Sequence, residues 1–147
     1  MTYLLLAPGE GERHALGGSS ETVIKAAGAD TGDTFFLSEN VVGPGFPGPP
    51  LHRHEALHDM FYVLEGTLAM RLGDEQHAVG AGTFVCVPPG VPHTFSNPGD
   101  APVRVLNFQT PGGWEDYMRE LGEAGRAGPL TSEQIGRIAS RHDFHVV

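Results

Sequence analysis

The chain has 147 residues, which is enough for one domain with a single core and too few for two comfortable ones. A formal net charge of -9, with only 9 lysines and arginines, leaves no basic patch for nucleic acid. No apolar stretch approaches the roughly 20 residues of a membrane span, and a single cysteine excludes an internal disulfide framework. We therefore expect one soluble, cytoplasmic domain over residues 1–147 that binds neither nucleic acid nor membrane.

The 21 glycines and 12 prolines lie between short apolar runs, which indicates many short strands joined by turns. The opening run Tyr3–Ala7 is a candidate edge strand that could exchange between two copies of the chain. Further strands are expected, in chain order, at 21–26, 34–42, 60–64, 67–72, 76–79, 83–87, 93–97 and 103–110. Turn signals about every 8–12 residues predict an all-β sandwich or barrel over about residues 20–110.

The sequence changes character in its C-terminal segment, 113–142. The i, i+3, i+4, i+7 spacing of apolar residues predicts a short amphipathic helix over 113–123. The residues with this spacing are Trp114, Tyr117, Met118 and Leu121. Thr131 and Gln134 are spaced like a capping box that opens a second helix. We expect both helices to pack on the barrel.

Four histidines and one aspartate form a candidate metal site. His52 and His54 are one residue apart on an extended stretch, so their imidazoles point to the same side of the chain. His58 and Asp59 follow where the chain can turn back, and His93 follows a proline-rich turn. Nitrogen and oxygen ligands of this kind suit one divalent metal ion.

Two groups of residues between positions 52 and 97 resemble the two motifs of the cupin superfamily. The second motif is matched by Gly82-x5-Pro88-x-Gly90-x2-His93-x3-Asn97. The first motif, His-x-His-x(3,4)-Glu-x6-Gly, is matched by His52, His54 and Gly66, with Asp59 where Glu is usual. The resemblance implies a double-stranded β-helix, or jelly-roll barrel, with the metal inside the barrel. Two short C-terminal helices would follow it.

The resemblance leaves the fourth ligand open. Cupins of the quercetin-dioxygenase type bind Fe, Ni or Mn with three histidines and a glutamate that often acts as the base. Here that slot reads His58-Asp59, so either Asp59 completes the set or His58 does, with Asp59 behind it orienting a ligand. We favour four histidines, because His58 shares parity with His52 and His54 and an imidazole reaches further than this short carboxylate. Adjacent strand residues point to opposite faces, so both do not bind.

The ligand set bears on the chemistry. Four neutral imidazoles leave a divalent ion as a stronger Lewis acid than a set with a carboxylate does. Such an ion suits a 1,3-dicarbonyl held through both oxygens, and a poly-β-ketone is a chain of these units. Zn is favoured for a nitrogen-rich, redox-inert site, with Ni, Fe, Mn or Co as alternatives. Asp59 is the candidate catalytic base if it is not itself a ligand.

The sequence also resembles the cupin-type aromatic polyketide cyclases of actinomycetes, small cupins that work beside type II polyketide synthases in antibiotic biosynthesis. The resemblance covers the barrel and runs into Thr110-Pro111-Gly112-Gly113-Trp114. It implies a metal-dependent cyclase that closes rings in a poly-β-ketone by aldol condensation and dehydration. A quercetinase-like dioxygenase and a non-catalytic small-molecule-binding cupin are the alternatives. The implied partners are an aromatic or polyketide substrate, a second copy of the chain and synthase components.

A cyclase of this kind needs a mostly apolar cavity with a few polar groups that fix the substrate. Asn107 and Gln109 share one face of the last predicted strand, so both could orient substrate oxygens. The candidate pocket residues are Tyr62, Met70, Phe95, Asn107, Gln109 and Trp114.

Overall fold

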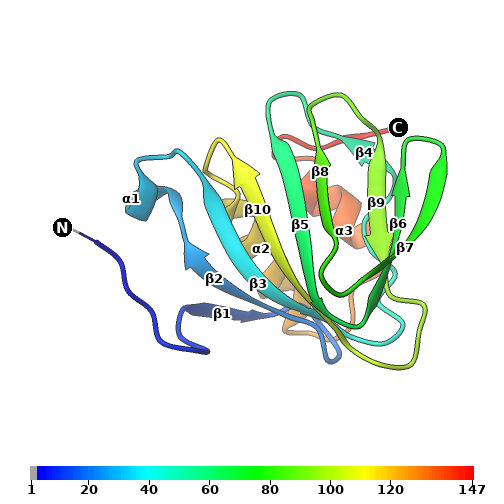
Figure 1. Cartoon of the computed structure of the whole chain (residues 1–147), viewed down its shortest axis with the longest axis horizontal. Helices are drawn as coiled ribbons and strands as arrows, with labels where there is room; N and C mark the ends of the chain where they lie inside the picture. Colours follow the sequence, from blue (N-terminus) through cyan, green and yellow to red (C-terminus); the bar gives the residue numbers. More distant parts are fainter. Residues whose placement is uncertain (1–2) are drawn as a thin grey trace.

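A computed structural model describes residues 3–147, which form eleven strands in two sheets (Figure 1). The first sheet has the order β1 (Glu12–Ala15), β2 (Glu21–Ala26), β3 (Phe36–Val42), β10 (Val103–Thr110), β5 (His58–Glu65) and β8 (Phe84–Val87). The second has the order β11 (His145–Val146), β4 (His52–Arg53), β9 (His93–Ser96), β6 (Thr67–Leu72) and β7 (Glu75–Gly80). Neighbouring strands pair antiparallel. The predicted all-β jelly roll is confirmed.

Alternating polarity places the strands as predicted. The strands expected at 21–26, 67–72 and 103–110 have the same bounds in the structure, as β2, β6 and β10. β5 and β6 join at Gly66, whose φ of 84° and whose approach to the Pro102 carbonyl leave no room for a side chain. A Cβ at position 66 would lie 2.9 Å from that oxygen. The turn therefore depends on glycine.

The opening run Tyr3–Ala7 was predicted as an edge strand, and this prediction is wrong. Within residues 3–7, which the structure describes, no strand forms, and Tyr3 and Leu5 are exposed to 73% and 77%. Apolar residues alone do not make a strand without a neighbour to pair with. The edge of the first sheet is instead β1, which follows a turn at Pro8 and Gly9.

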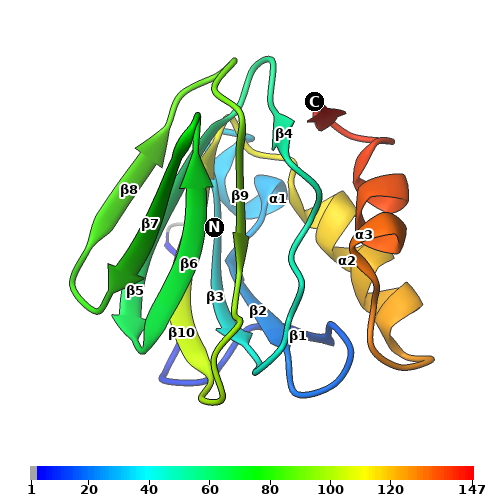
Figure 2. The ribbon, with the colours of Figure 1, turned by 90° about the vertical axis from the view of Figure 1, so that its right-hand side faces the viewer.

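The short helix α1 (Gly28–Thr31) links β2 to β3, and two longer helices follow the barrel. α2 (Glu115–Gly125) and α3 (Ser132–Ala139) contact each other, and α2 also contacts β1 (Figure 2). The predicted capping box is confirmed, because Thr131 Oγ1 accepts from Gln134 N at 3.1 Å and Gln134 Oε1 accepts from Thr131 N at 2.8 Å. In residues 3–147 we find no helix long and apolar enough to cross a membrane.

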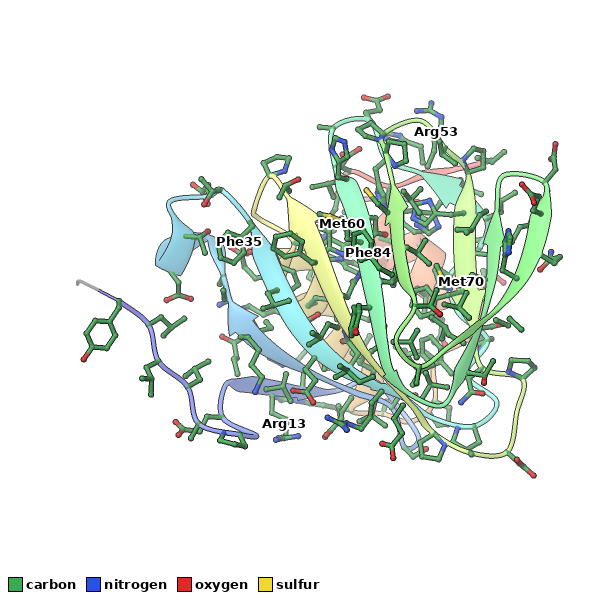
Figure 3. The ribbon with its side chains drawn as sticks, in the orientation of Figure 1. Arg13, Phe35, Arg53, Met60, Met70 and Phe84 are labelled. Carbon is green, nitrogen blue, oxygen red and sulfur yellow. The ribbon has the colours of Figure 1, made fainter. Side chains whose placement is uncertain are left out.

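The core has two parts. One packs the apolar stripe of α2 and Ile135 of α3 onto the first sheet, and the other lies among β5, β6, β7 and β10. The outer face of the first sheet keeps apolar side chains exposed, with Phe84 at 59% and Tyr62 at 42% (Figure 3). Phe84 stands opposite Tyr62, and Met60 lies on the same outer face.

Candidate metal centre

Three histidines from two strands and one loop meet inside the barrel. His52 on β4 is the register partner of His93 on β9, and their ring centroids are 4.4 Å apart. The His54 ring lies 4.9 Å from that of His52 and 5.1 Å from that of His93. All three side chains are buried. The predicted same-side placement of His52 and His54 is confirmed.

Asp59 completes this cluster from β5. Its Oδ2 lies 3.3 Å from His54 Nε2 and 3.0 Å from His93 Nε2. One ligand atom from each of Asp59 and the three histidines lies within 4.8 Å of the others. The cluster can therefore hold one ion between three nitrogens and one oxygen.

His58 was the favoured fourth ligand, and the structure contradicts this. β5 begins at His58, whose side chain is exposed, while Asp59 is buried. Because strand side chains alternate, His58 shares the outer face with Met60 and Tyr62. The turn over residues 55–57 removes the parity that linked His58 to His54 in the sequence. Three histidines and Asp59 are the arrangement that the fold provides.

Hydrogen bonds at the far side of each ring orient the three imidazoles. Nδ1 of His52 lies 2.8 Å from the Pro50 carbonyl and Nδ1 of His93 lies 3.0 Å from the Val91 carbonyl. Nδ1 of His54 bonds the carbonyl of Asp143. A carbonyl only accepts, so each Nδ1 carries a proton, and each Nε2 presents a lone pair to the cluster when its ring is neutral.

These lone pairs test whether a metal ion fits. Two of them, on His54 and His93, face the Asp59 oxygen, which is itself only an acceptor. Three buried acceptors around one point repel one another unless a cation lies between them. A divalent ion meets this need with every donor already aimed at it, so the donor set fits a metal.

Asn107 and Gln109 hold the other oxygen of Asp59. Asn107 Nδ2 donates to Asp59 Oδ1 at 2.9 Å, and Gln109 Nε2 donates to the same atom at 2.8 Å. Gln109 also donates to Asn107 Oδ1 at 2.7 Å. Both amides were predicted to orient substrate, but in the structure they orient the carboxylate. Such outer contacts fix a ligand's direction and its tautomer or charge state.

The cluster shifts the pKa values of its members in opposite directions. Burial would raise the pKa of Asp59, but the hydrogen bonds that His54 and His93 donate when their rings are protonated outweigh burial and hold it far below its usual range. Burial, aided by His93, lowers the pKa of His52 to about 3. Burial would lower the pKa of His54, yet the hydrogen bond and the charge of Asp59 raise it above its usual value.

The raised pKa of His54 predicts a pH dependence of metal binding. Below that pKa His54 carries a proton that the ion must displace, and above it the proton is already lost. The apparent affinity for Zn²⁺ or Ni²⁺ should rise between pH 6 and pH 8, by up to about tenfold per unit for one displaced proton. Calorimetry in buffers of different ionisation enthalpy measures the released proton. The exposed His58→Ala variant should release the same number, and pH-independent binding without release would contradict the prediction.

The C-terminal residues 143–147, which we call the clasp, contact the loop of residues 54–57 that carries His54. The Asp143 carboxylate accepts from the backbone N–H groups of residues 55, 56 and 57 at 2.7, 2.9 and 3.1 Å. Phe144, 3% exposed, stacks on His52 with ring centroids 3.9 Å apart and an interplanar angle of 16°. β11 then pairs with β4. The clasp was not predicted, because no local pattern in the sequence links residue 143 to His54.

One narrow cavity of about 70 Å³ extends from the cluster to the helices. His52 and Asp59 lie at one end, and most of the wall is apolar. The predicted pocket residues Phe95, Asn107 and Trp114 line it. Three predicted pocket residues do not line it: Tyr62 lies on the outer face of β5, Met70 is 1% exposed in the core between strands, and Gln109 is buried against Asp59 and Asn107. The phase of β5 decided the outcome for Tyr62, whereas Met70 and Gln109 point inward and are covered by their neighbours.

Comparisons with known proteins agree with this architecture. A family model described as a cupin domain matches residues 39–108. Quercetin 2,3-dioxygenase of Bacillus subtilis (strain 168) is 39% identical over 97 residues, which are 65% of this chain and only 27% of that protein. The polyketide cyclase RemF from Streptomyces resistomycificus is 27% identical, with a TM-score of 0.56 over 66% of this chain and 68% of that one. An RmlC-like cupin from Shewanella frigidimarina, 18% identical, has a TM-score of 0.64 over 80% of this chain and 96% of its own and shows the fold alone.

Proposed function

We propose that this chain, whose residues 39–108 match the cupin-domain model, is a small cupin that acts as a metal-dependent polyketide cyclase. His52, His54, Asp59 and His93 would hold one divalent ion. The reaction would join the methylene carbon of one 1,3-dicarbonyl unit to a carbonyl carbon further along the chain. One carbon–carbon bond forms, and the new hydroxyl leaves as water with a neighbouring hydrogen.

One observation carries the proposal: both oxygens of Asp59 are already engaged. Oδ1 accepts from two amides and Oδ2 faces two imidazoles. Its depressed pKa also makes it a weak base near neutral pH. The carboxylate that often acts as the base in quercetinase-type cupins is therefore not free to do so here. This favours chemistry in which the ion makes the substrate acidic.

A divalent ion at this site would act as a Lewis acid on two carbonyl oxygens and increase the acidity of the methylene between them. The protein supplies the surroundings. The apolar walls limit the water that competes for the carbonyls. Burial and the nearby Asp59 charge raise the pKa of Tyr117, which lines the cavity and remains a protonated donor for a substrate oxygen.

The ligand set in the structure gives the metal centre a different net charge from the one expected from sequence. Four histidines would have left two positive charges on a divalent ion, but Asp59 removes one of them. The net charge of the metal centre therefore does not distinguish a cyclase from an oxygenase. The engaged carboxylate, the apolar cavity and the likeness to RemF support the cyclase.

A quercetinase-like dioxygenase is the second candidate. The likeness to the Bacillus enzyme and the carboxylate in the donor set support it. The two candidates differ in what they consume and release. A dioxygenase takes up oxygen, whereas an aldol cyclisation with dehydration releases water and needs no oxygen.

We expect the metal-loaded chain to convert a short poly-β-ketone mimic without oxygen into a cyclic product lighter by one water. Mass spectrometry of anaerobic reactions identifies that product, and an oxygen electrode records uptake with a flavonol or a diketone. The control is His93→Ala, which should form product no faster than the buffer. Metal-dependent oxygen uptake, with no anaerobic product, would replace the cyclase by the dioxygenase.

Several expectations from sequence remain proposals. Zn is still favoured, while Ni, Fe, Mn and Co also accept nitrogen and oxygen ligands, and elemental analysis would decide among them. A homodimer, contact with synthase components and a cytoplasmic location stay predictions, as does the alternative of a non-catalytic binding cupin.

A further inference from the structure

The far end of the cavity carries a group of neutral polar side chains. Ser20 and Asn40 line the wall there, and both are buried. Thr22 stands opposite Asn40 in the β2–β3 register, and Ser38 follows on the same face of β3. We call Ser20, Thr22, Ser38 and Asn40 the distal polar group. It lies on the inner face of the first sheet, beneath the helices.

These side chains satisfy one another only in part. Asn40 Nδ2 donates to Ser38 Oγ at 3.0 Å, and Ser20 Oγ accepts from Gly43 N at 2.9 Å. Thr22 is 0% exposed, and its Oγ1 has no hydrogen-bond partner among residues 3–147. A buried hydroxyl without a partner costs stability. A polar group retained at such a cost is characteristic of a binding site.

The register places Asn40, the member of the distal polar group that lines the cavity from β3, at a defined distance from the metal centre. Asp59 pairs with Gln109, and Gln109 pairs with Phe36 on β3. Asn40 lies two strand spacings across from Asp59 and four residues along, which amounts to roughly 16 Å. A ligand that touches both ends of the cavity is therefore elongated.

The chemistry of the two ends differs. The cavity wall carries an imidazole and a carboxylate at the metal end, whereas Ser20 and Asn40 of the distal polar group offer it one hydroxyl and one amide. Such neutral groups bond a ketone or hydroxyl oxygen, and they offer no counter-charge to a carboxylate, phosphate or ammonium.

We infer that the distal polar group is a second recognition site for the ligand of the metal centre. It binds a neutral ketone or hydroxyl oxygen at the far end of an elongated, otherwise apolar molecule. The inference rests on the proposed function in one respect, which is that the metal end receives the dicarbonyl. It narrows the substrate class to chains or fused rings of roughly 16 Å that carry oxygen at both ends.

Two matched probes test this inference on the full, Zn²⁺-loaded chain. Both carry a 1,3-diketone at one end of a rigid aromatic frame, and the far end is a hydroxyl in one and a methyl in the other. The chain has a single tryptophan, Trp114, which lines the cavity and reports binding by fluorescence. The natural chain should prefer the hydroxyl probe by roughly tenfold. Asn40→Leu should abolish this preference while keeping the affinity for the methyl probe.

Thr22→Val adds a readout that does not depend on a ligand. Because the Thr22 hydroxyl has no partner, the isosteric valine should raise Tm by roughly 2–4 °C and weaken only the hydroxyl probe. The matched control is Thr67→Val on the exposed part of β6, which should change neither quantity. A loss of Tm in Thr22→Val would mean that the hydroxyl supports the fold, and it would overturn the inference.

The remaining outcomes separate this inference from the proposed function. Equal binding of the two probes, no binding of either, or an equal loss of both in Asn40→Leu would overturn the inference. A preference for the hydroxyl probe without any dehydrated product would overturn the cyclase and leave the distal site standing. Formation of the dehydrated product without a preference for the hydroxyl probe would overturn the distal site and leave the cyclase standing.

Discussion

Replacing Asp59 with alanine is expected to weaken the binding of a divalent ion by at least about 100-fold, whereas replacing His58 leaves it unchanged. Asp59 brings the one carboxylate that the described residues place in the cluster, and its Oδ2 lies 3.0 Å from His93 Nε2. Without it, an ion keeps three nitrogens and loses the negative charge that compensates its burial. His58 is exposed on the outer face of β5, so it contributes neither a ligand atom nor a charge to the cluster.

Isothermal calorimetry with Zn²⁺ and Ni²⁺ on both variants measures this difference. His58→Ala is a close control, because it changes the adjacent residue and was itself a candidate ligand. The affinity of Asp59→Asn for the ion should fall between those of Asp59→Ala and the natural chain, since an amide keeps an oxygen but brings no charge. Circular dichroism verifies that each variant is folded. If His58→Ala lost the ion and Asp59→Ala kept it, the four-histidine arrangement would be correct.

Replacing Phe144 with alanine is expected to lower the free energy of unfolding by about 3–5 kcal/mol and Tm by about 10 °C. Phe144 is 3% exposed, belongs to the core cluster of α2 and α3, and stacks on His52 at 3.9 Å. Its loss leaves a cavity beside a ligand ring, so the affinity for the ion should also fall, by about tenfold. Thermal unfolding and metal titration measure the two effects.

The matched control for this variant is Phe84→Ala. Phe84 is 59% exposed on β8, so the same chemical change should cost within about 0.5 kcal/mol and leave metal binding intact. Asp143→Ala separates the two functions of the clasp, because it keeps the Phe144 ring and removes the acceptor of three backbone N–H groups. If both clasp variants bound the ion as tightly as the natural chain, the clasp would only stabilise the fold.

Short-range patterns in the sequence determined the strands, the turns and the two C-terminal helices, while the resemblance to the two cupin motifs implied the jelly roll and the meeting of His52, His54 and His93. Alternation with period two and the spacing of apolar residues along a helix are local properties, so β2, β6 and β10 could be predicted to the residue. The capping box at Thr131 depends on a separation of three residues. Within each of these patterns, a few neighbours contain all the information.

Tertiary structure alone decided which residue of the His58-Asp59 pair enters the barrel. β5 is apolar on both faces, with Phe61 and Val63 inside and Met60 and Tyr62 outside, so its sequence did not reveal which face is buried. Packing against β10 set that phase, because Asp59 then meets Gln109. The contact between His54 and Asp143 joins residues 89 apart in the chain. Such a contact depends on where the whole barrel places the C-terminus, which no short stretch of sequence can specify.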